Sequence, residues 1–338
     1  MMVATAAVLG AGAWGTVFAQ VLADAGNRVF LWARRPEQVE SINRGENPQY
    51  VPGVGLNGIE ATGDAPAALA DSSLVVVAVP SFAVRQVLTE FRDHIRPDAT
   101  VVSLVKGVEP GSLLFMSDVI ADATEVAPDR IVAVSGPNLS AEIARHEPTG
   151  TVVAGIDLER AGLVASRIHT DYFRPYVSGD IIGAEIGGVV KNVIAMVVGA
   201  AVGLEKGINT RSSLITRGLN EMARLGVALG GEAETFLGLA GLGDLVATCS
   251  TPLSRNFAFG QRIGRGMAIE EALAESAGVV EGARSCPLIL QIADSRGVDM
   301  PITGCAGKVL SGQMSPDEVA AWLLRRPRST DGVDPRQV

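Results

Sequence analysis

The stretch AAVLGAGAWGTVFAQVLADAG, residues 6–26, decides the fold. A short aliphatic run ends in a Gly-x-Gly-x-x-Gly pattern formed by Gly10, Gly12 and Gly15, and a helical pattern follows at once. In a strand–turn–helix unit, these glycines permit a tight turn, close approach of a pyrophosphate and close packing of helix on strand. The pyrophosphate lies at the positive end of the helix. The stretch therefore predicts a dinucleotide-binding βαβ unit, the alternative being a purely structural glycine-rich turn.

Short aliphatic runs alternate with amphipathic stretches from Ala4 to about Tyr176. The runs cover residues 6–10, 28–33, 74–80, 100–105, 130–136 and 150–155, and helical patterns include Val17–Ala25 and Phe82–His94. Continuous β-branched runs are typical of strands buried on both faces of a parallel sheet. This alternation predicts an α/β domain of the Rossmann type, with a doubly wound sheet.

The character of the sequence changes near Gly179. From Asp180 onward there is hardly a convincing strand, and helical periodicity continues to about Leu324. We therefore expect a dinucleotide-binding domain over residues 1–182 and an all-helical substrate domain over 183–326. The polar tail, residues 327–338, is expected to be disordered.

Composition excludes several functional classes. The 338 residues are 47% hydrophobic and 19% charged, which excludes a disordered chain. The formal charge of −9 argues against a partner that is nucleic acid or an anionic membrane. Three cysteines without a CxxC pair fit neither a disulfide framework nor a cysteine-rich metal site, so we expect no metal. The longest apolar stretch, residues 192–204, is too short to span a bilayer, and the N-terminus lacks a basic signal region, which together predict a cytoplasmic protein.

The end of the second predicted strand distinguishes between nicotinamide cofactors. An NAD site places Asp or Glu there to hold the ribose 2′-hydroxyl group, whereas this chain has Arg34 and Arg35 and no acid until Glu37. Two guanidinium groups suit a 2′-phosphate. We therefore expect NADPH to be favoured, with NADH possible; in the alternative reading the two arginines are merely solvated.

Lysine is the best candidate for the acid–base group. His94, His146 and His169 lie among polar residues in expected surface segments, and only four of the 28 basic residues are Lys. Lys191 stands in a helix that is apolar nearly all round, where burial would lower its pKa; a Lys that reaches out to solvent is the alternative. Lys106 ends a predicted strand at the edge of the sheet where ligands of α/β proteins bind, unless it is a solvated loop cation.

A third cluster lies in residues 238–266. Ser254 can cap a helix that begins near Arg255, and Asn256 adds a neutral donor, so the helix start can bind an anion. Asp244, between glycine-rich segments, could hold a hydroxyl group or orient Lys191. An ordinary helix cap with a surface Arg explains the Ser-Arg-Asn sequence equally well.

At these residues the sequence resembles the bacterial-type NAD(P)-dependent glycerol-3-phosphate dehydrogenase family. The resemblance runs from residue 8 to about 285. The matching stretches are GAGAWGTVFAQVLA, WARRPEQ, NPQYVPGV, VKGVEPGS, SGPNLSAEIA, KNVIAMVVGAAVGL, NTRSSLITRGLNEM, GLAGLGDLVATCSTPLSRNFAFG and GVVEGARS.

The resemblance implies a role for particular residues. Lys191 would be the catalytic acid–base residue. The substrate would be bound by Lys106, Gly136, Asn138, Lys191, Asp244, Ser254, Arg255 and Asn256. The dinucleotide would be contacted by Gly10, Gly12, Ala13, Trp14, Gly15, Arg34, Arg35, Tyr50, Lys106, Ser140, Arg255, Val279 and Glu281. The family usually has Thr or Ser and then Phe after Gly-Pro, where this chain has Asn138-Leu139, which puts the contacts of Asn138 and Ser140 in question.

The implied reaction is the reversible reduction of dihydroxyacetone phosphate by NADPH to sn-glycerol 3-phosphate, which feeds glycerophospholipid synthesis. Two alternatives share the fold: a β-hydroxyacid-type dehydrogenase acting on a carboxylate, and a catalytically silent nucleotide-sensing protein. The apolar helical half is compatible with a homodimer.

Overall fold

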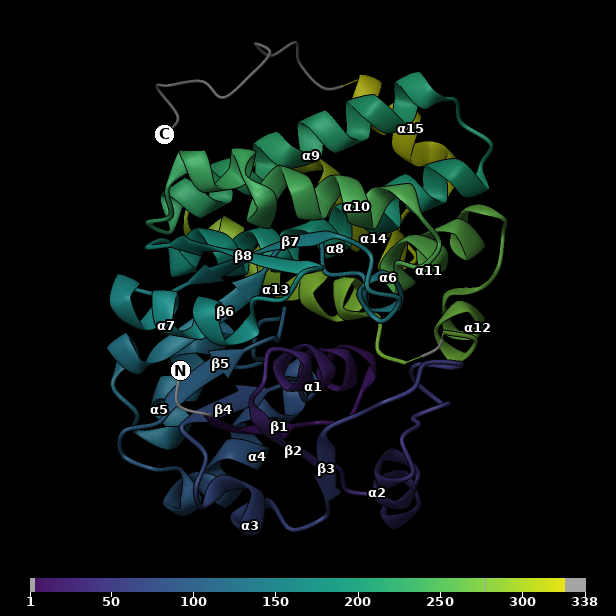
Figure 1. The fold of residues 1–338 in the computed structure, drawn as a ribbon. Helices are drawn as coiled ribbons and strands as arrows, with labels where there is room; N and C mark the ends of the chain where they lie inside the picture. The colour runs from purple at the N-terminus through teal and green to yellow at the C-terminus, as the bar shows by residue number, and fades with distance from the viewer. Residues whose placement is uncertain (1–3, 277, 326–338) are drawn as a thin grey trace. The chain divides into compact units, whose positions relative to one another are not determined.

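Eight strands in the first half of the chain form one sheet in the order β3-β2-β1-β4-β5-β6-β7-β8 (Figure 1). The structure, a computed structural model, describes residues 4–276 and 278–325. The strands are β1 Thr5–Leu9, β2 Arg28–Trp32, β3 Ile59–Thr62, β4 Leu74–Val77, β5 Thr100–Ser103, β6 Ile131–Ser135, β7 Thr149–Ala154 and β8 Phe173–Ser178. The predicted Rossmann-type fold is confirmed, because the chain order reverses between β1 and β4 as in doubly wound sheets.

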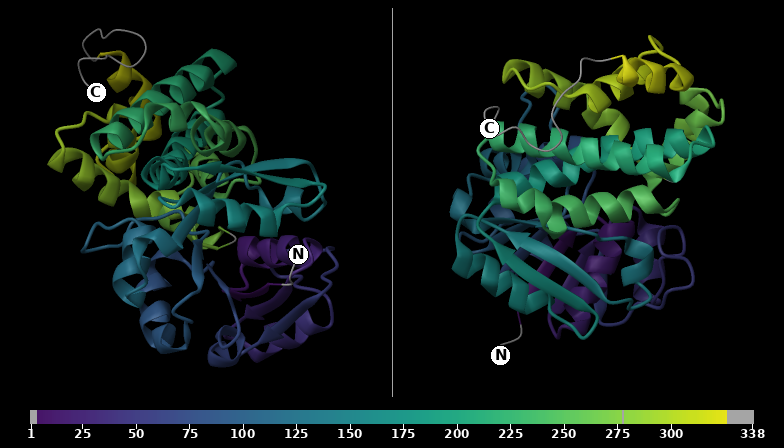
Figure 2. Two further views of the ribbon diagram at one scale, coloured as in Figure 1. Left: turned by 60° about the vertical axis from the view of Figure 1, so that its left-hand side comes forward. Right: turned by 90° about the horizontal axis from the view of Figure 1, so that it is seen from above.

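The sheet is mostly, but not wholly, parallel. Strands β1 to β6 run parallel, whereas β7 runs antiparallel to β6. Strand β8 is parallel to β7, and the pair is drawn as the two long teal arrows of Figure 2. The expectation of a parallel sheet is wrong for β7 and β8. The connection from β6 to β7 holds only the one-turn helix α6, Ser140–Ile143, which is too short to carry the chain back along the sheet.

The six aliphatic runs all contain strands, and two strands lie outside them. Strand β3 has four residues and exposes Glu60, and β8 buries Phe173 but leaves Arg174 and Tyr176 largely exposed around Pro175. Both are the end strands of the sheet. Edge strands are short, tolerate Pro and carry polar residues, so they lack the continuous apolar pattern of a buried strand.

The helices of unit 1, Met1–Ile181, cover this sheet. They are α1 Ala13–Asp24, α2 Pro36–Asn43, α3 Ala65–Leu69, α4 Val84–Phe91, α5 Met116–Thr124, α6 Ser140–Ile143 and α7 Leu158–Ile168, with 3-10 turns at Ser81–Ala83, Arg92–His94 and Pro128–Arg130. The predicted helix Phe82–His94 is thus an α-helix with a 3-10 turn at each end. Strand residues such as Val8, Val76 and Val134 lie in the core of the unit.

Unit 2, Ile182–Val338, is helical throughout its described residues. Its helices are α8 Ile181–Gly203, α9 Ile208–Ala228, α10 Asp244–Ser250, α11 Arg255–Gly264, α12 Ile269–Ala274, α13 Glu281–Ser295, α14 Pro301–Leu310 and α15 Pro316–Leu324, with a 3-10 turn at Ala233–Leu237 and a π turn at Leu239–Gly243. Helix α8 is long and apolar enough to cross a membrane, but 83% of its most apolar window is buried, as predicted for a core helix. The prediction of a disordered tail lies outside the described residues.

Helices α8 and α11 touch backbone to backbone. A Cβ on Gly199 would collide with the carbonyl oxygen of Phe257, and a Cβ on Gly260 would collide with that of Met196. Glycine at both positions lets the helix axes approach more closely than larger residues would. This contact holds α8, which carries Lys191, against the first half of α11.

Candidate active site

The loop between β1 and α1 has the shape that a dinucleotide requires. Gly10 has φ +119°, and a Cβ there would lie 2.8 Å from the carbonyl oxygen of Ala78. A Cβ on Gly15 would collide with the carbonyl oxygen of Gly10, so helix and loop pack without side chains between them. Nothing lies within 4 Å of the position that a Cβ on Gly12 would take, and Gly12 caps α1 without a side chain. The first amides of α1 can therefore bind an anion, and the loop fits a pyrophosphate.

Ala13 and Trp14 open α1 directly after this loop. The Trp14 ring packs edge-on against Phe18, with 5.4 Å between the ring centroids. Its Nε1 is buried and has no acceptor among the described residues. Buried donors are normally paired, so this N–H fits a bond to a bound ligand.

Arg34 and Arg35 follow β2, and both are exposed. Arg35 donates from Nη2 to the Oε1 atoms of Gln49 at 2.6 Å and Gln38 at 3.2 Å, and its guanidinium group lies 6.0 Å from the centre of the Tyr50 ring. Three residues predicted to contact the dinucleotide, Arg34, Arg35 and Tyr50, therefore occupy one region at the end of β2.

Lys106 lies after β5 and reaches the loop that follows β6. Its Nζ donates to the carbonyl oxygen of Gly136 at 3.2 Å. In the same loop, Nδ2 of Asn138 donates to Oγ1 of Thr151 at 3.0 Å, while its Oδ1 is buried without a partner in the described part of the chain. Ser140 begins α6 two residues later. The structure thus brings Lys106, Gly136 and Asn138 together within unit 1.

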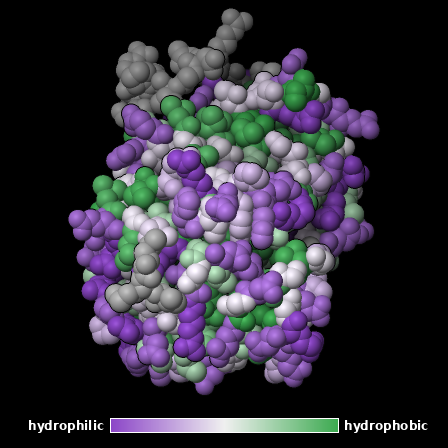
Figure 3. Space-filling model, viewed as in Figure 1, coloured by the Kyte–Doolittle hydropathy of each residue, from purple (hydrophilic) through white to green (hydrophobic). Residues whose placement is uncertain are grey.

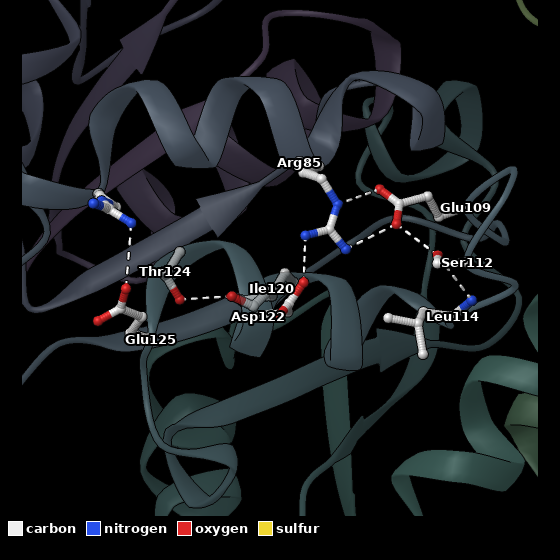
Figure 4. Close-up of polar contacts among 9 residues, drawn as sticks. Arg85, Glu109, Ser112, Leu114, Ile120, Asp122, Thr124 and Glu125 are labelled. Atoms are coloured by element: carbon white, nitrogen blue, oxygen red, sulfur yellow. Dashed lines mark hydrogen bonds and ion pairs between the residues drawn. The ribbon is translucent and has the colours of Figure 1, made fainter.

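A charged network holds the segment that follows Lys106 (Figure 4). Arg85 on α4 donates to both carboxylate oxygens of Glu109 at 2.8 Å, and it also bonds to Asp122 on α5. Ser112 donates to Glu109 at 2.6 Å. The hydrogen bonds from Arg85 lower the pKa of Glu109, so the carboxylate stays charged at neutral pH. Three residues after Lys106, the chain is therefore fixed to α4, whose Arg85 also bonds to α5.

Lys191 lies in the middle of α8 and is buried. Its Nζ donates to Oδ1 of Asp244 at 2.5 Å and to Oγ1 of Thr248 at 2.7 Å. Burial alone would favour the neutral amine, but the adjacent carboxylate stabilises the ammonium form. The reading in which Lys191 reaches solvent is wrong, because its side chain is 9% exposed and that of Asp244 is 1% exposed.

The start of α11 carries the residues for which an anion site is predicted. Ser254 caps the helix, with its Oγ accepting from the N–H of Phe257 at 3.3 Å, as predicted. Arg255 is exposed and its guanidinium group lies against Gly278, next to Val279. Arg255 begins α11 and Glu281 begins α13. The residues predicted to contact the dinucleotide here, Arg255, Val279 and Glu281, therefore lie near the starts of these two helices.

Asn256 has structural partners that the sequence did not reveal. Its Nδ2 donates to Oδ1 of Asn192 at 2.9 Å, and its Oδ1 accepts from the N–H of Gly282 at 2.9 Å. Asn192 directly follows Lys191 on α8, and Gly282 lies in the first turn of α13. One amide thus joins α8, α11 and α13 at the start of α11.

Thr248 and Asn192 are the site residues that sequence reasoning missed. Thr248 stands four residues after Asp244 on α10, and this spacing puts both on one face of a helix. That spacing was the available signal for Thr248. For Asn192 there was only its position next to Lys191. The three histidines are all exposed, as expected.

Comparison with known proteins identifies the family. Residues 5–161 match the model of the NAD-dependent glycerol-3-phosphate dehydrogenase N-terminus, and residues 180–321 match that of its C-terminus. The chain is 53% identical over 323 residues to glycerol-3-phosphate dehydrogenase (NAD(P)+) of Frankia casuarinae, a match that covers 95% of this chain and 96% of the relative. It is 48% identical over 327 residues to the enzyme of the same name from Corynebacterium glutamicum strain R, covering 96% and 98%.

A solved structure agrees with these sequence matches. The crystal structure of glycerol-3-phosphate dehydrogenase from Coxiella burnetii has a TM-score of 0.90 and 35% identity, covering 95% of this chain and 98% of that one. The sequence matches and the fold therefore agree. The chain belongs to the NAD-dependent glycerol-3-phosphate dehydrogenase family.

Proposed function

We propose that this protein catalyses the reversible reduction of dihydroxyacetone phosphate to sn-glycerol 3-phosphate with an NAD(P)H cofactor. The observation that carries the proposal is the buried amino group of Lys191, which bonds to Asp244 and Thr248 in the unit that also contains the capped start of α11. A ketone that is reduced at one carbon and phosphorylated at another needs both a proton donor and an anion site.

Each residue has a task in this reaction. The bound dinucleotide supplies the hydride. Lys191 polarises the ketone oxygen and gives it a proton from Nζ, and Asp244 keeps that nitrogen protonated and oriented. The reverse reaction returns the proton to Lys191. Arg255, the first amides of α11 and the hydroxyl group of Ser254 hold the phosphate.

Oxidation of NADPH measured with and without dihydroxyacetone phosphate tests the reaction. We expect oxidation to depend on the phosphorylated ketone and to fall about 10²–10⁴-fold in Lys191→Arg, which keeps a cation beside Asp244 but releases a proton far less readily. Lys308→Arg on α14, the same substitution at a residue outside the proposed site, is the matched control. Faster turnover of a 2-keto acid would favour a β-hydroxyacid-type dehydrogenase, and binding of NADPH without any turnover would favour a nucleotide sensor.

We also propose that NADPH is preferred to NADH. Arg34 and Arg35 stand where an NAD-specific enzyme has an acid, and both are exposed to a ligand. Replacing both with Gln should weaken NADPH binding about 10–100-fold and leave NADH binding nearly unchanged. Arg44→Gln, at the other end of α2, is the control. Equal losses for both cofactors would place these arginines outside the 2′-phosphate site.

We also propose a cellular setting for the protein. Three buried cysteines outside any disulfide and the burial of α8 suit a cytoplasmic enzyme, whose product would feed glycerophospholipid synthesis. We expect no nucleic-acid or integral-membrane partner, and a homodimer fits the apolar helical unit. Fractionation of cells and light scattering of the purified protein test these points.

A further inference from the structure

Unit 2 contains a large cavity that is separate from the proposed active site. Its volume is about 1270 Å³, above the ~300–1,000 Å³ that is usual for small-molecule sites. Helices α8, α9, α11, α14 and α15 contribute to its wall, and we call it the helical cavity. Lys191, Asp244, Ser254, Arg255 and Asn256 do not line it.

Much of the wall is apolar. Its larger side chains include Leu204, Phe259, Ile263, Ile302, Val309 and Leu323. Figure 3 shows apolar side chains gathered in patches on the surface, among hydrophilic ones. The apolar wall of a concave site such as the helical cavity favours a ligand with a hydrocarbon portion.

Four cations also line the cavity. Lys206 and Arg296 are exposed, while Arg217 and Arg224 are half-buried on α9. Nη2 of Arg224 donates to the carbonyl oxygen of Asp299 at 2.8 Å, which orients that guanidinium group. Long basic side chains cover apolar surface with their stems while their charges face solvent or an anion.

The two acids of the lining do not balance these cations. Glu221 is fully buried and accepts from the N–H groups of Ile302 at 2.5 Å and Thr303 at 3.1 Å, at the start of α14. Burial raises the pKa of Glu221 to about 7, so near neutral pH it carries only part of a charge. Asp299 is the other acid. Four cations against two acids leave the helical cavity with a net positive charge.

We propose that the helical cavity binds an amphipathic anion, with its hydrocarbon chain against the apolar wall and its carboxylate or phosphate head at the basic side chains. Charge complementarity favours this occupant over two others. A second copy of the chain, docked symmetrically at the cavity, would place its own copy of this positively charged surface against the first. The C-terminal residues 326–338 have three Arg and two Asp and few apolar residues, so their composition does not complement the cavity either.

Calorimetric titration of the full chain with decyl phosphate and with decanoate tests the proposal. We expect one anion to bind per chain, and the two probes distinguish a phosphate ligand from a fatty acid. Decyltrimethylammonium, a cation, and neutral decyl maltoside should bind at least about tenfold more weakly, since each lacks a charge-assisted bond to the basic groups. Saturating glycerol 3-phosphate should not displace the anion.

Two variants locate the site. Lys206→Glu combined with Arg296→Glu reverses two exposed charges and should weaken anion binding at least about tenfold, while reduction of dihydroxyacetone phosphate persists. Arg265→Glu, an exposed Arg of unit 2 outside the cavity lining, is the matched control. Val309→Phe narrows the cavity without a change of charge and should weaken decanoate more than octanoate. Because these readouts measure binding, they stand even if the proposed reaction fails.

Several results would overturn the proposal. Equal binding of the anionic, neutral and cationic probes would mean non-specific apolar adsorption. Displacement by glycerol 3-phosphate would place the anion in the active site. A changed oligomeric state of the double variant, seen by light scattering, would make the cavity a subunit interface. Much tighter decanoate binding to a chain ending at Arg325 would mean that the C-terminal residues occupy it.

Discussion

Replacing Asp244 by Asn tests the ion pair of the active site directly, because the side chain keeps its shape and loses only its charge. The pair is buried, with Asp244 1% and Lys191 9% exposed at their side chains, so water cannot replace the lost carboxylate. Removing one partner of a buried ion pair costs about 3–5 kcal/mol. Lys191 avoids much of this cost by releasing its proton, and a neutral amine cannot protonate the ketone. We expect kcat to fall about 10²–10⁴-fold at neutral pH and to recover in part at lower pH.

The assay is the oxidation of NADPH by dihydroxyacetone phosphate across a pH series, with thermal unfolding to verify folding. Asp294→Asn changes an exposed carboxylate on α13 and should leave both rate and pH profile as they are. Thr248→Ser keeps the hydroxyl group and should keep most of the activity. Thr248→Val removes the hydrogen bond from Lys191, which is worth about 1 kcal/mol. If Asp244→Asn retained more than about a tenth of the activity with an unchanged pH profile, the role assigned to this ion pair would be refuted.

Three further predictions follow from contacts elsewhere. Arg255→Lys keeps the charge but loses the planar fork, so it should raise KM for dihydroxyacetone phosphate and spare dihydroxyacetone; equal proportional losses would remove Arg255 from the phosphate site. Glu109→Gln breaks the ion pair with Arg85 that fixes the segment after Lys106, and it should raise KM for dihydroxyacetone phosphate about 2–10-fold, a loss of ~0.4–1.4 kcal/mol for a partly exposed pair, with little change in Tm; a lower Tm at unchanged KM would mean that the ion pair is purely structural. Burial raises the pKa of Glu221 from 4.5 to about 7, so the folded state holds a proton that the unfolded state loses, and stability falls as pH rises through that window. The free energy of unfolding should therefore fall by up to about 1.4 kcal/mol per pH unit up to pH 7, and Tm should fall with it; Glu221→Gln should lack this decline when Tm is measured between pH 5 and 8.

The central part of the fold could be predicted because burial leaves a strong signal. Runs such as LVVV in β4 are buried on both faces, and the glycine pattern after β1 has few alternative structures. The end strands β3 and β8 could not be predicted, because an edge strand is stabilised by one neighbour and carries no continuous apolar run. The direction of β7 depends on how the chain turns back after β6, which no residue pattern in that loop determines.

For the candidate site, the sequence predicted individual residues but not the residues with which they form hydrogen bonds. The scarcity of Lys led to Lys191, and a cap residue followed by Arg led to Ser254 and Arg255. The bond from Asn256 to Asn192 joins residues 64 positions apart, and that from Arg85 to Glu109 joins residues 24 apart. Such pairs are set by tertiary packing, which one sequence does not encode in any local pattern.

Gly199 and Gly260 limit the substitutions that this enzyme can tolerate. Neither residue bears a functional group, yet a single added methyl at either would force α8 and α11 apart. Because one helix carries Lys191 and the other begins with Arg255, the displacement would reach both the proposed proton donor and the proposed phosphate site. In a screen of random mutants, Gly260→Ala would score as an enzyme of reduced activity and reduced abundance, and a second change restoring both would be expected on the facing helix rather than near the substrate.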